Sequence, residues 1–492
     1  MYATAWWYAT AWWYATAYGA TTGPAARPAR PVAGLSEGIA RVTTPAVPQI
    51  AIPRVPPGTL GRLALWLGVA ANVAVVNWLL VVSPYPGSNV YFVMGRFFGL
   101  HAALIMALQL LLIARLPWLD RRIGMDRLTA WHRWTGYTLL WTIVAHASCI
   151  VFGLAMMSGT SFSGQVVDLA TTWEGVLWAM IAGGLLLAIG LVSARFARRR
   201  LPYETWHLLH LGTYVAVLLA LTHQIAVGTT FTASPFAMAY WWTLWSVALG
   251  AVLAGRVFLP LWRNLRHRFR VERVVPESEN VVSVYVTGRR LDRLPAQAGQ
   301  FFLWRFLSRD RWWQANPFSL STAPDGRTLR LTAKAVGTGS AGLRRIPVGT
   351  RVFAEGPYGA FTGMHRTRTA TLLVAGGVGV TPIRSLLESL GGHIVVLYRV
   401  RTEADAVLVD ELRTLAEARG ADLRLVTGPS RPAPPTGPIF GPDHLRELVP
   451  DIRERDVFVC GPVGMTGAVL RSLRQLRVPR RQVHSERFGL AG

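Results

Sequence analysis

The sequence has few cysteines, few acidic residues and almost no lysine. Its 492 residues include only two cysteines, Cys149 and Cys460, which excludes a disulfide framework or a four-cysteine metal site. Only 16% of the residues are charged and 51% are hydrophobic, yet the formal net charge is +25. A basic nucleic-acid-binding protein reaches such a charge through many charged residues, so this composition argues against nucleic acid as a partner. Lys334 is the single lysine, and arginine supplies the remaining positive charge.

Residues 1–58 make up the first of four segments that we predict. A six-residue aromatic repeat occupies residues 2–7 and 8–13, and a decayed third copy follows over residues 14–19. Three short copies are too few for a repeat fold, and residues 23–58 are rich in proline and alanine. We therefore predict a disordered tail over residues 1–58. The alternative is that its Trp and Tyr residues lie at a membrane interface.

Long apolar runs recur between residues 59 and 265 and predict a membrane bundle of six transmembrane helices. The runs cover residues 63–82, 97–113, 131–156, 173–194, 203–227 and 236–261. Arginines crowd the loops after the second, fourth and sixth runs, whereas loops 157–172 and 228–235 contain no Lys or Arg. By the positive-inside rule, we expect a multi-pass protein of the cell membrane with both termini in the cytoplasm.

The last two segments have the patterns of soluble domains. Short alternating strands such as residues 281–286 and 328–332 predict an antiparallel β-barrel domain over residues 266–366. Strands then alternate with helices, which predicts an α/β, Rossmann-like nucleotide-binding domain over residues 367–492. The expected fold class is thus a multi-domain chain with a helical membrane bundle, a β-barrel and an α/β domain in that order.

Histidines stand out in the third and fifth predicted helices. An ionisable residue within a membrane span costs free energy, so its presence suggests a function. Neutral imidazole is a good axial ligand for haem iron. His132 and His146 are 14 residues apart, and His210 and His223 are 13 apart, so the pairs match in depth at roughly 20 Å separation. A spacing of 13 residues does not return to one helix face. The fifth helix must therefore bulge, kink or reach the two sites from different flanks.

We predict that His132, His146, His210 and His223 hold two haems, with His207 as the alternative to His210. The segments His132-Arg-Trp-Thr-Gly136 and Trp206-His-Leu-Leu-His210 resemble the transmembrane domain of the ferric reductase and NADPH oxidase superfamily. The resemblance runs from about residue 60 to the C-terminus. It implies two b-type haems between the third and fifth helices, with His132 and His210 on the cytoplasmic side.

Two segments of the β domain resemble the flavin-binding signatures of the ferredoxin–NADP reductase superfamily. The first implies contacts of an aromatic ring and a hydroxyl group with the flavin, and it consists of Asn316, Pro317, Phe318, Ser319, Leu320 and Ser321. Asn316 stands where the membrane members usually have histidine. The second implies binding of the FAD pyrophosphate by Lys334, Gly337, Gly339 and Ser340.

A glycine-rich run follows an apolar strand of the last domain and opens a helix, as a dinucleotide site requires. The residues that we expect to bind there are Gly376, Gly377, Val378, Gly379, Thr381 and Pro382. After the next strand, Tyr398 offers a stacking ring, while Arg399 and Arg401 offer guanidinium groups for the adenosine 2′-phosphate. Arginine binds phosphate bidentately, which favours NADPH over NADH.

The end of the chain supplies two candidate catalytic residues. Cys460, with Gly461 and Pro462, resembles the segment that the reductases place beside the nicotinamide. Phe488, in Glu486-Arg-Phe488, resembles the aromatic residue that covers the flavin until the nicotinamide displaces it, although four residues follow it here.

The resemblance implies an enzyme that moves electrons from cytoplasmic NAD(P)H through FAD and two haems to a small acceptor outside the membrane. We expect the acceptor to be a ferric chelate or dioxygen, which makes the chain a transmembrane reductase, with ferric reduction favoured slightly over superoxide production. One alternative is an electron conduit to a partner redox protein. The other is a non-catalytic haem-binding sensor or structural subunit of the membrane.

Overall fold

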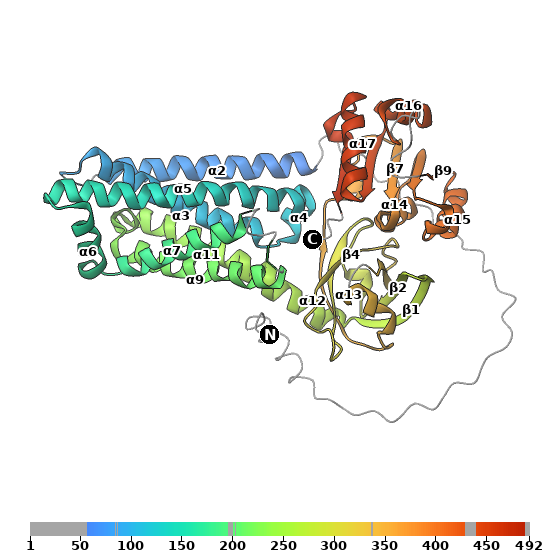
Figure 1. Ribbon diagram of the computed structural model, residues 1–492, viewed down its shortest axis with the longest axis horizontal. Coiled ribbons are helices and arrows are strands. Elements are labelled where there is room, and N and C mark those ends of the chain that lie inside the picture. The colour runs from blue at the N-terminus through green and yellow to red at the C-terminus, as the bar shows by residue number, and fades with distance from the viewer. Residues whose placement is uncertain are drawn as a thin grey trace. The chain divides into compact units, whose positions relative to one another are not determined.

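The computed structural model describes residues 57–83, 85, 87–194, 200–201, 203–335, 338–428 and 439–487. The predicted tail lies outside these residues except for Pro57 and Gly58, which begin a helix. Six helices within the described ranges can cross a membrane by length and composition, which confirms the six predicted spans. They are α2 (Pro57–Val82), α3 (Val90–Ile113), α5 (Met125–Ser158), α7 (Val176–Ser193), α9 (Tyr203–Val227), and a sixth formed by α11 (Pro235–Leu253), η1 (Ala254–Phe258) and α12 (Leu259–His267) (Figure 1).

The connections contain helices that the hydrophobic pattern does not predict. A short helix α4 (Pro117–Ile123) precedes α5, and Gly124 separates them with a φ of 94°. The polar loop expected over residues 157–172 holds helix α6 (Phe162–Thr172), whose N-cap Ser161 accepts a hydrogen bond from the Gly164 amide at 3.1 Å. A one-turn helix, α10 (Thr229–Thr232), follows α9. Such short polar helices depend on capping and contacts, which an apolar run does not reveal.

Glycines bring α3 and α5 into close contact. A Cβ atom on Gly153 would lie 2.6 Å from the backbone nitrogen of Phe92, and one on Gly95 would lie 2.7 Å from the Ile150 side chain. Small residues let membrane helices approach closely, because van der Waals packing holds helices together in lipid. The bundle core also includes the fully buried rings of Trp241 and Trp245 from α11.

The sixth span contains a π-helical turn, η1, in its C-terminal half. Gly255 lies within this turn, where a Cβ atom would meet the carbonyl oxygen of Ala114 at 2.0 Å. Arg256 donates from Nε to the carbonyl oxygen of Ile113 at 2.8 Å. A π-turn shifts the register of a helix and often accompanies a functional site. Here η1 lets the sixth helix pack closely against the end of α3.

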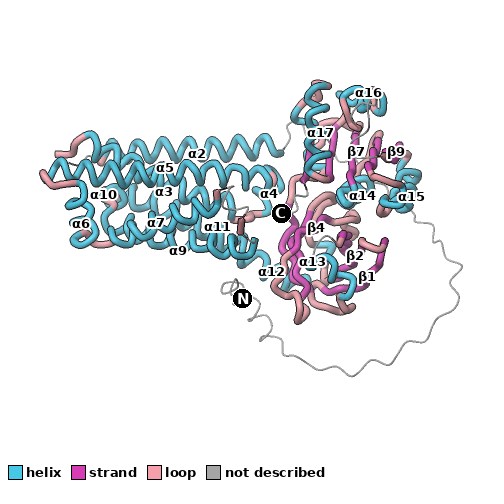
Figure 2. The backbone as a smooth tube through the Cα atoms, viewed as in Figure 1, coloured by secondary structure: helices cyan, strands magenta, loops and turns pink. Residues whose placement is uncertain are grey.

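Two three-stranded antiparallel sheets follow the bundle (Figure 2). One contains β1 (Arg270–Ser278), β2 (Val281–Thr287) and β5 (Thr328–Lys334), and the other contains β4 (Asn316–Ser319), β3 (Phe301–Phe306) and β6 (Val352–Tyr358). Phe302, Trp304 and Phe306 alternate inward along β3 and pack against residues of β2 and β5. Single bridges, Arg270 to Arg351 and Leu320 to Leu331, connect the two sheets at their edges. Closure into the expected barrel stays a prediction.

The C-terminal part is a parallel five-stranded sheet in the order β11-β10-β7-β8-β9. Its strands are β7 (Thr371–Gly376), β8 (Ile394–Arg399), β9 (Asp422–Val426), β10 (Asp456–Gly461) and β11 (Val483–Arg487). Residues of α14 (Val380–Ser389) and α15 (Val409–Arg419) pack on one face, and residues of α16 (Pro442–Leu448) and α17 (Val463–Gln475) pack on the other. Helices on both faces explain why these strands are continuous apolar runs.

The membrane helices are joined to the second antiparallel sheet through β6. Asp120 of α4 accepts a hydrogen bond from the Gly359 amide at 2.6 Å, and Arg115 forms an ion pair with Glu355 at 3.1 Å. On α12, Asn264 donates to the carbonyl oxygen of Ala354 and accepts from its amide, both at 2.9 Å. Neighbouring helix ends thus hold one strand by its backbone.

We expect Gly153→Val to destabilise the protein, because the larger side chain would press on the backbone of α3. Overpacking of this kind costs roughly 1–3 kcal/mol. Gly68→Val is the matched control, since no atom lies within 4 Å of a Cβ at that position of α2. Thermal unfolding of the purified variants in one detergent tests this, and equal midpoints would show that the glycine contact is dispensable.

Candidate functional site

His132 of α5 and His210 of α9 face each other across the bundle. Their ring centroids are 6.1 Å apart and the rings are inclined by 79°. Two imidazoles that share one metal ion, with metal–nitrogen distances of about 2 Å, have centroids roughly 6 Å apart. The Nδ1 atom of His132 is buried without a hydrogen-bond partner. The spacing of the two rings would therefore allow both to hold one metal centre, such as a haem iron.

Other side chains fix the orientation of the His210 ring. Its Nδ1 atom lies 3.2 Å from the hydroxyl oxygen of Ser193, which also accepts a hydrogen bond from Trp206 Nε1 at 3.2 Å. The Trp206 ring stacks on His210 with centroids 5.1 Å apart. A partner on Nδ1 leaves Nε2 available to a metal and sets the ring plane. This arrangement favours His210 over His207 as the ligand.

His146 and His223 line one cavity of about 560 Å³ in the other half of the bundle. The Nδ1 atom of His146 lies 2.8 Å from the carbonyl oxygen of Gly95, while the Nδ1 atom of His223 is buried without a partner. Gly99 makes room for the His146 ring, because a Cβ atom there would lie 2.7 Å from it. The cavity is mostly apolar, and its size is typical of a cofactor site.

Helix α9 passes both histidine pairs as a regular α-helix. The structure therefore supports the last of the three geometries that the 13-residue spacing allowed, in which the helix reaches the two sites from different flanks. Among the described residues, groups of three or more His, Cys, Asp or Glu side chains that could hold a bare metal ion are absent. Pairs of histidines suit haem, whose porphyrin supplies the other four ligands.

The first predicted flavin segment forms β4, but its two serine hydroxyls differ. The hydroxyl of Ser321 receives hydrogen bonds from Arg330 Nε at 2.9 Å and from Thr332 at 2.8 Å. The hydroxyl of Ser319 is buried and has no partner. Trp304 donates to the carbonyl oxygen of Phe318 at 3.1 Å and holds the strand in place. Ser319 is thus the hydroxyl that a ligand could use.

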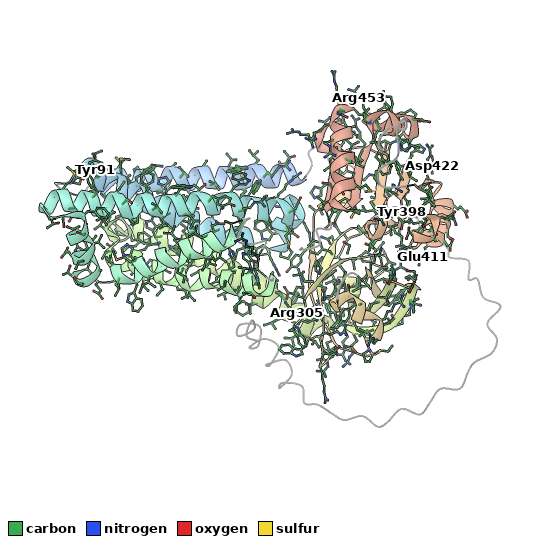
Figure 3. All side chains as sticks on the ribbon, viewed as in Figure 1. Tyr91, Arg305, Tyr398, Glu411, Asp422 and Arg453 are labelled. Atoms are coloured by element: carbon green, nitrogen blue, oxygen red, sulfur yellow. The ribbon has the colours of Figure 1, made fainter. Side chains whose placement is uncertain are left out.

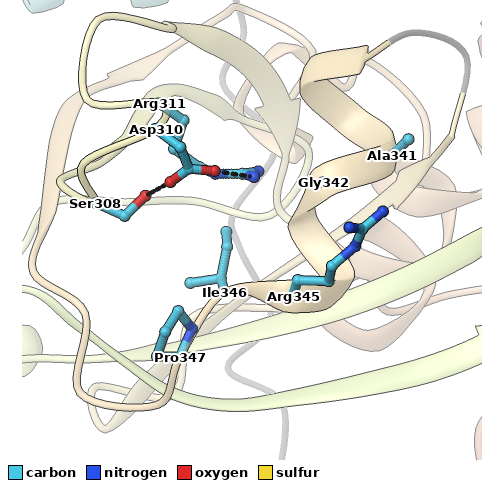
Figure 4. Close-up of a pocket in the computed structure, with 8 residues that line it drawn as sticks. All are labelled: Ser308, Asp310, Arg311, Ala341, Gly342, Arg345, Ile346 and Pro347. Carbon is cyan, nitrogen blue, oxygen red and sulfur yellow. Dashed lines mark hydrogen bonds and ion pairs between the residues drawn. The ribbon is translucent and has the colours of Figure 1, made fainter.

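A pocket of about 360 Å³ adjoins the second flavin segment (Figure 4). Arg311 and Arg345 line it from opposite sides, next to helix α13 (Thr338–Ala341) and the following turn. Arg311 pairs with Asp310 at 2.7 Å, but its Nη1 atom is buried without a partner. Lys334 is exposed at the end of β5, and Gly337 lies outside the described residues. Arg311 and Arg345 could not be recognised from sequence, because they lie outside the flavin-binding motif.

The glycine-rich run connects β7 to α14 as predicted. Gly377 has a φ of 52°, and no atom lies within 4 Å of a Cβ built there. Gly379 packs against β10, where a Cβ atom would lie 2.3 Å from the carbonyl oxygen of Cys460. The first glycine leaves open space for a ligand, and the second brings the loop beside the Cys460 segment. Both are features of a loop whose amides approach a phosphate group.

The structure corrects the predicted role of Tyr398, which is fully buried on β8 (Figure 3). Its hydroxyl donates to the carbonyl oxygens of Gly377 at 3.3 Å and Val407 at 3.2 Å. The ring therefore supports the glycine loop from within the core and cannot stack on an adenine. Arg399 donates to the carbonyl oxygens of Val426 at 3.2 Å and Gly428 at 2.6 Å, whereas Arg401 is exposed.

Cys460 and Glu486 lie opposite each other on the neighbouring strands β10 and β11. Burial raises the pKa of the Cys460 thiol, so the sulfur keeps its proton. Burial also raises the pKa of Glu486 to about 8, helped by the nearby carboxylates of Asp126 and Asp120. Sequence reasoning missed Glu486, although it begins the C-terminal motif. Phe488, the predicted ring over the flavin, lies outside the described residues.

A buried ion-pair network links the flavin segment to the nucleotide-binding part. Glu411 of α15 accepts from Arg330 of β5 at 2.8 Å and from Arg384 of α14 at 2.6 Å. Both arginines also donate to the backbone oxygen of Ser321, at 3.1 Å and 3.0 Å. Because charge-assisted hydrogen bonds are strong and directional, this network fixes the end of β4 against the parallel sheet.

Comparisons with known proteins match the two halves of the chain separately. Residues 98–221 match the family described as ferric reductase like transmembrane component, and residues 373–471 match the oxidoreductase NAD-binding domain. Ferredoxin–NADP reductase B of Sorangium cellulosum is 35% identical over 189 residues, which are 35% of this chain and 77% of the relative.

Two further similarities cover the C-terminal half. The reductase component of propane 2-monooxygenase from Rhodococcus jostii is 28% identical over 237 residues, covering 45% of this chain and 63% of the relative. The solved FAD/NAD-binding domain of nitric oxide dioxygenase from Vibrio cholerae O1 biovar El Tor is 24% identical and covers 45% of this chain and 98% of that domain, with a TM-score of 0.37.

The Glu486 carboxyl group makes stability depend on pH. Its pKa of about 8 in the folded protein exceeds the ordinary glutamate pKa of 4.5, so the folded state binds the proton more tightly. This stabilisation is complete below the pKa of the unfolded state and is lost as the pH rises through the pKa of the folded state. We expect Glu486→Gln to flatten the fall of the unfolding temperature between pH 5 and pH 8.5. Glu454→Gln, at an exposed site, is the control, and identical slopes in both variants would contradict this assignment.

Proposed function

Because the chain belongs to the family of ferric reductase-like flavocytochromes, with ferredoxin reductase-type FAD and NAD domains, we propose that it carries electrons from cytoplasmic NAD(P)H across the membrane. The two histidine pairs between α5 and α9 are the observation that carries this proposal. They lie in different halves of the bundle, one facing pair at 6.1 Å and one pair in a shared cavity. Two successive haem sites would divide electron transfer across the membrane into shorter steps.

Bound FAD would supply acceptance of a hydride from the nicotinamide and release of single electrons, and two b-type haems would supply electron relay across the membrane. His132 and His210 would hold the inner haem, and His146 and His223 the outer haem. On the β domain, which we propose is a closed barrel, Phe318 and Ser319 would contact the flavin ring. Arg311 and Arg345 would bind the FAD phosphates together with the Lys334 segment, since guanidinium groups match phosphate oxygens bidentately.

The nucleotide would bind at the carboxyl ends of β7, β8 and β10, as ligands of open parallel sheets do. The Gly376–Gly379 loop leaves space for the pyrophosphate beside the start of α14. Cys460 and Glu486 would flank the nicotinamide and flavin, and burial keeps a proton on each of them near neutral pH. Glu486 can therefore hold a proton at its carboxyl group beside the flavin. We retain Phe488 as the proposed aromatic cover.

The proposed orientation puts α4, α12 and both termini in the cytoplasm. Helix α4 carries Arg121 and Arg122 in its last turn, and α12 carries Arg266. The same ends contact β6 of the flavin-binding part. The positive-inside rule and the side on which NAD(P)H is available therefore agree.

The acceptor at the outer haem is a ferric chelate or dioxygen. Arg96 is the charged residue among those lining the outer cavity, and it already donates to Ser83 at 2.6 Å and to Thr230 at 2.9 Å. An apolar cavity of this kind suits a small molecule that reaches the haem edge. A partner redox protein remains the alternative acceptor.

Anaerobic titration of the purified protein with NADPH, followed through flavin and haem absorbance, tests the proposal. We expect the flavin to bleach and both haems to become reduced, and subsequent addition of ferric chelate or oxygen to reoxidise them. Haem reduction without reoxidation by either acceptor would favour a partner protein. Absence of any flavin or haem change would contradict the proposal and favour a sensor or structural subunit.

Replacement of the outer ligands should remove one haem. We expect His146→Ala and His223→Ala each to lose the outer haem and keep the inner one, because each removes one of two axial nitrogens. His101→Ala is the control, since its ring packs on Phe97 at 4.1 Å rather than in a histidine pair. The haem-to-protein ratio measures this, and an unchanged ratio in both ligand variants would show that the assignment is wrong.

Arg401 is the exposed guanidinium that we expect to recognise the 2′-phosphate of NADPH. Loss of a hydrogen bond to a charged group costs about 1.5–3 kcal/mol. Arg401→Ala should therefore raise the KM for NADPH by roughly tenfold or more and leave the KM for NADH unchanged. Arg446→Ala, at an ion pair on α16, is the control. Equal increases for both nucleotides would place the 2′-phosphate elsewhere.

A further inference from the structure

A cavity of about 980 Å³ lies where α2, α4 and α5 meet β11 and the end of β6. One wall comes from the ends of the membrane helices and the other from the reductase part. None of the predicted cofactor-binding residues lines it. Glu486, which we propose lies beside the flavin, does line it, but the arginines of its lining have no role in the electron path proposed above.

Arginines dominate the lining of this cavity. Six of them contribute to it: Arg62, Arg122, Arg127, Arg133, Arg480 and Arg481. Asp126 and Glu486 are the acidic residues of the lining, with His365 and His484 as neighbours. The positive charges outnumber the carboxyl groups.

Within the described residues, most of these guanidinium groups have no side-chain partner. Arg62 donates to the Thr59 hydroxyl at 3.2 Å. For the other five, the described part of the chain supplies neither an ion pair nor a side-chain hydrogen bond. Like charges gathered around one cavity repel each other, and a bound anion would relieve that repulsion. Planar guanidinium groups pair with phosphate through two parallel hydrogen bonds.

Two arginines of the cavity lie away from the nucleotide site proposed above. Arg480 and Arg481 precede β11 and so lie at the amino end of the parallel sheet. The glycine loop follows the carboxyl end of β7, which is the end where open parallel sheets bind their ligands. An anion held by Arg480 and Arg481 would therefore occupy a different end of the sheet from NAD(P)H.

Aromatic residues place the cavity near a membrane surface. Trp66 of α2 and Trp131 of α5 are in edge contact, with centroids 5.6 Å apart. They follow Arg62 and Arg127 by about one helical turn, and Trp66 is 55% exposed. Tryptophan favours the level of the lipid headgroups, and basic pockets on the cytoplasmic side of membrane helices bind anionic headgroups.

We propose that this cavity binds a phosphate-bearing anion, which arginines of both walls hold between the membrane helices and β11. The phosphate group could belong to an anionic lipid of the cytoplasmic leaflet or to a soluble phosphate compound, because the recognition chemistry is the same. Assignment to the cytoplasmic leaflet rests on the orientation in the proposed function. Anion binding itself does not depend on electron transfer, so the two proposals can fail independently.

The experiment uses the full-length protein with its cofactors in nanodiscs of phosphatidylcholine. One arm adds increasing fractions of phosphatidylglycerol, and the other adds pyrophosphate to discs of phosphatidylcholine alone. Thermal unfolding and equilibrium binding are measured in both arms, because a ligand of the folded state raises the unfolding temperature. We expect stabilisation by phosphatidylglycerol if the source is lipid and by pyrophosphate if the source is soluble.

Variants of each wall make the test specific. Each surface arginine contributes about 1 kcal/mol to binding of an anionic headgroup, so Arg480→Gln with Arg481→Gln should weaken binding roughly 30-fold. Arg122→Gln with Arg127→Gln should do the same from the opposite wall. Arg289→Gln with Arg290→Gln removes two exposed charges outside the cavity and should leave binding unchanged.

Two results would overturn the proposal. One is that neither phosphatidylglycerol nor pyrophosphate stabilises the protein relative to phosphatidylcholine alone. The other is that the Arg289 and Arg290 control weakens binding as much as the cavity variants, which would indicate a general effect of surface charge. Weakened binding in both cavity variants, with normal flavin and haem content, would support the proposal even if the acceptor remained unidentified.

Discussion

The attachment of β6 to the ends of the membrane helices is the contact on which the rest of the structure depends. In the electron path that we propose, electrons would pass from the flavin to a haem within the bundle, so the two parts would need a fixed separation. Asn264 of α12 holds the backbone of β6 at 2.9 Å, and Asp120 of α4 holds the amide of the residue that follows the strand, Gly359, at 2.6 Å. Such short contacts to backbone groups allow little sliding. The inner histidine pair lies on α5 and α9, and α5 starts directly after α4.

Burial of charge at this junction is tolerated because most of the charges have partners. Glu355 is almost fully buried and receives Arg115 at 3.1 Å and Arg305 at 2.7 Å. Removing one partner of such a group would cost stability, because the remaining charge would be unpaired in surroundings of low polarity. Asp120 has only the Gly359 amide and a pKa raised to about 6 by burial. Glu486 has no partner for its buried Oε2 atom and keeps its proton instead.

The same principle separates the roles of the two arginine groups in the reductase part. Arg330 and Arg384 are buried, are paired with the carboxylates of Glu411 and Glu388, and donate to the backbone of the flavin segment. Arg480 and Arg481 are exposed around a cavity and lack counter-ions among the described residues. Neutralised arginines stabilise a fixed geometry, whereas arginines without counter-ions attract an anion from solution or from a lipid surface. A count of arginines in the sequence does not distinguish these two groups.

The sequence by itself determined the membrane helices, the sheet that follows them and the glycine loop between β7 and α14. Each of these depends on local periodicity or on residues that are consecutive in the chain. The sequence also indicated four histidines at matched depths, but the 13-residue spacing left their geometry open.

Only the tertiary structure decided which side chains are available, because availability depends on contacts between distant residues. In the folded chain the Ser321 hydroxyl accepts a hydrogen bond from Arg330, whereas the Ser319 hydroxyl has no hydrogen-bond partner. It buried Tyr398 beneath the loop that it was expected to assist. It brought His132 to His210 and gathered arginines from distant segments around one cavity. Hydrophobic period is a property of one segment, whereas the partner of a buried polar atom is a property of the folded chain.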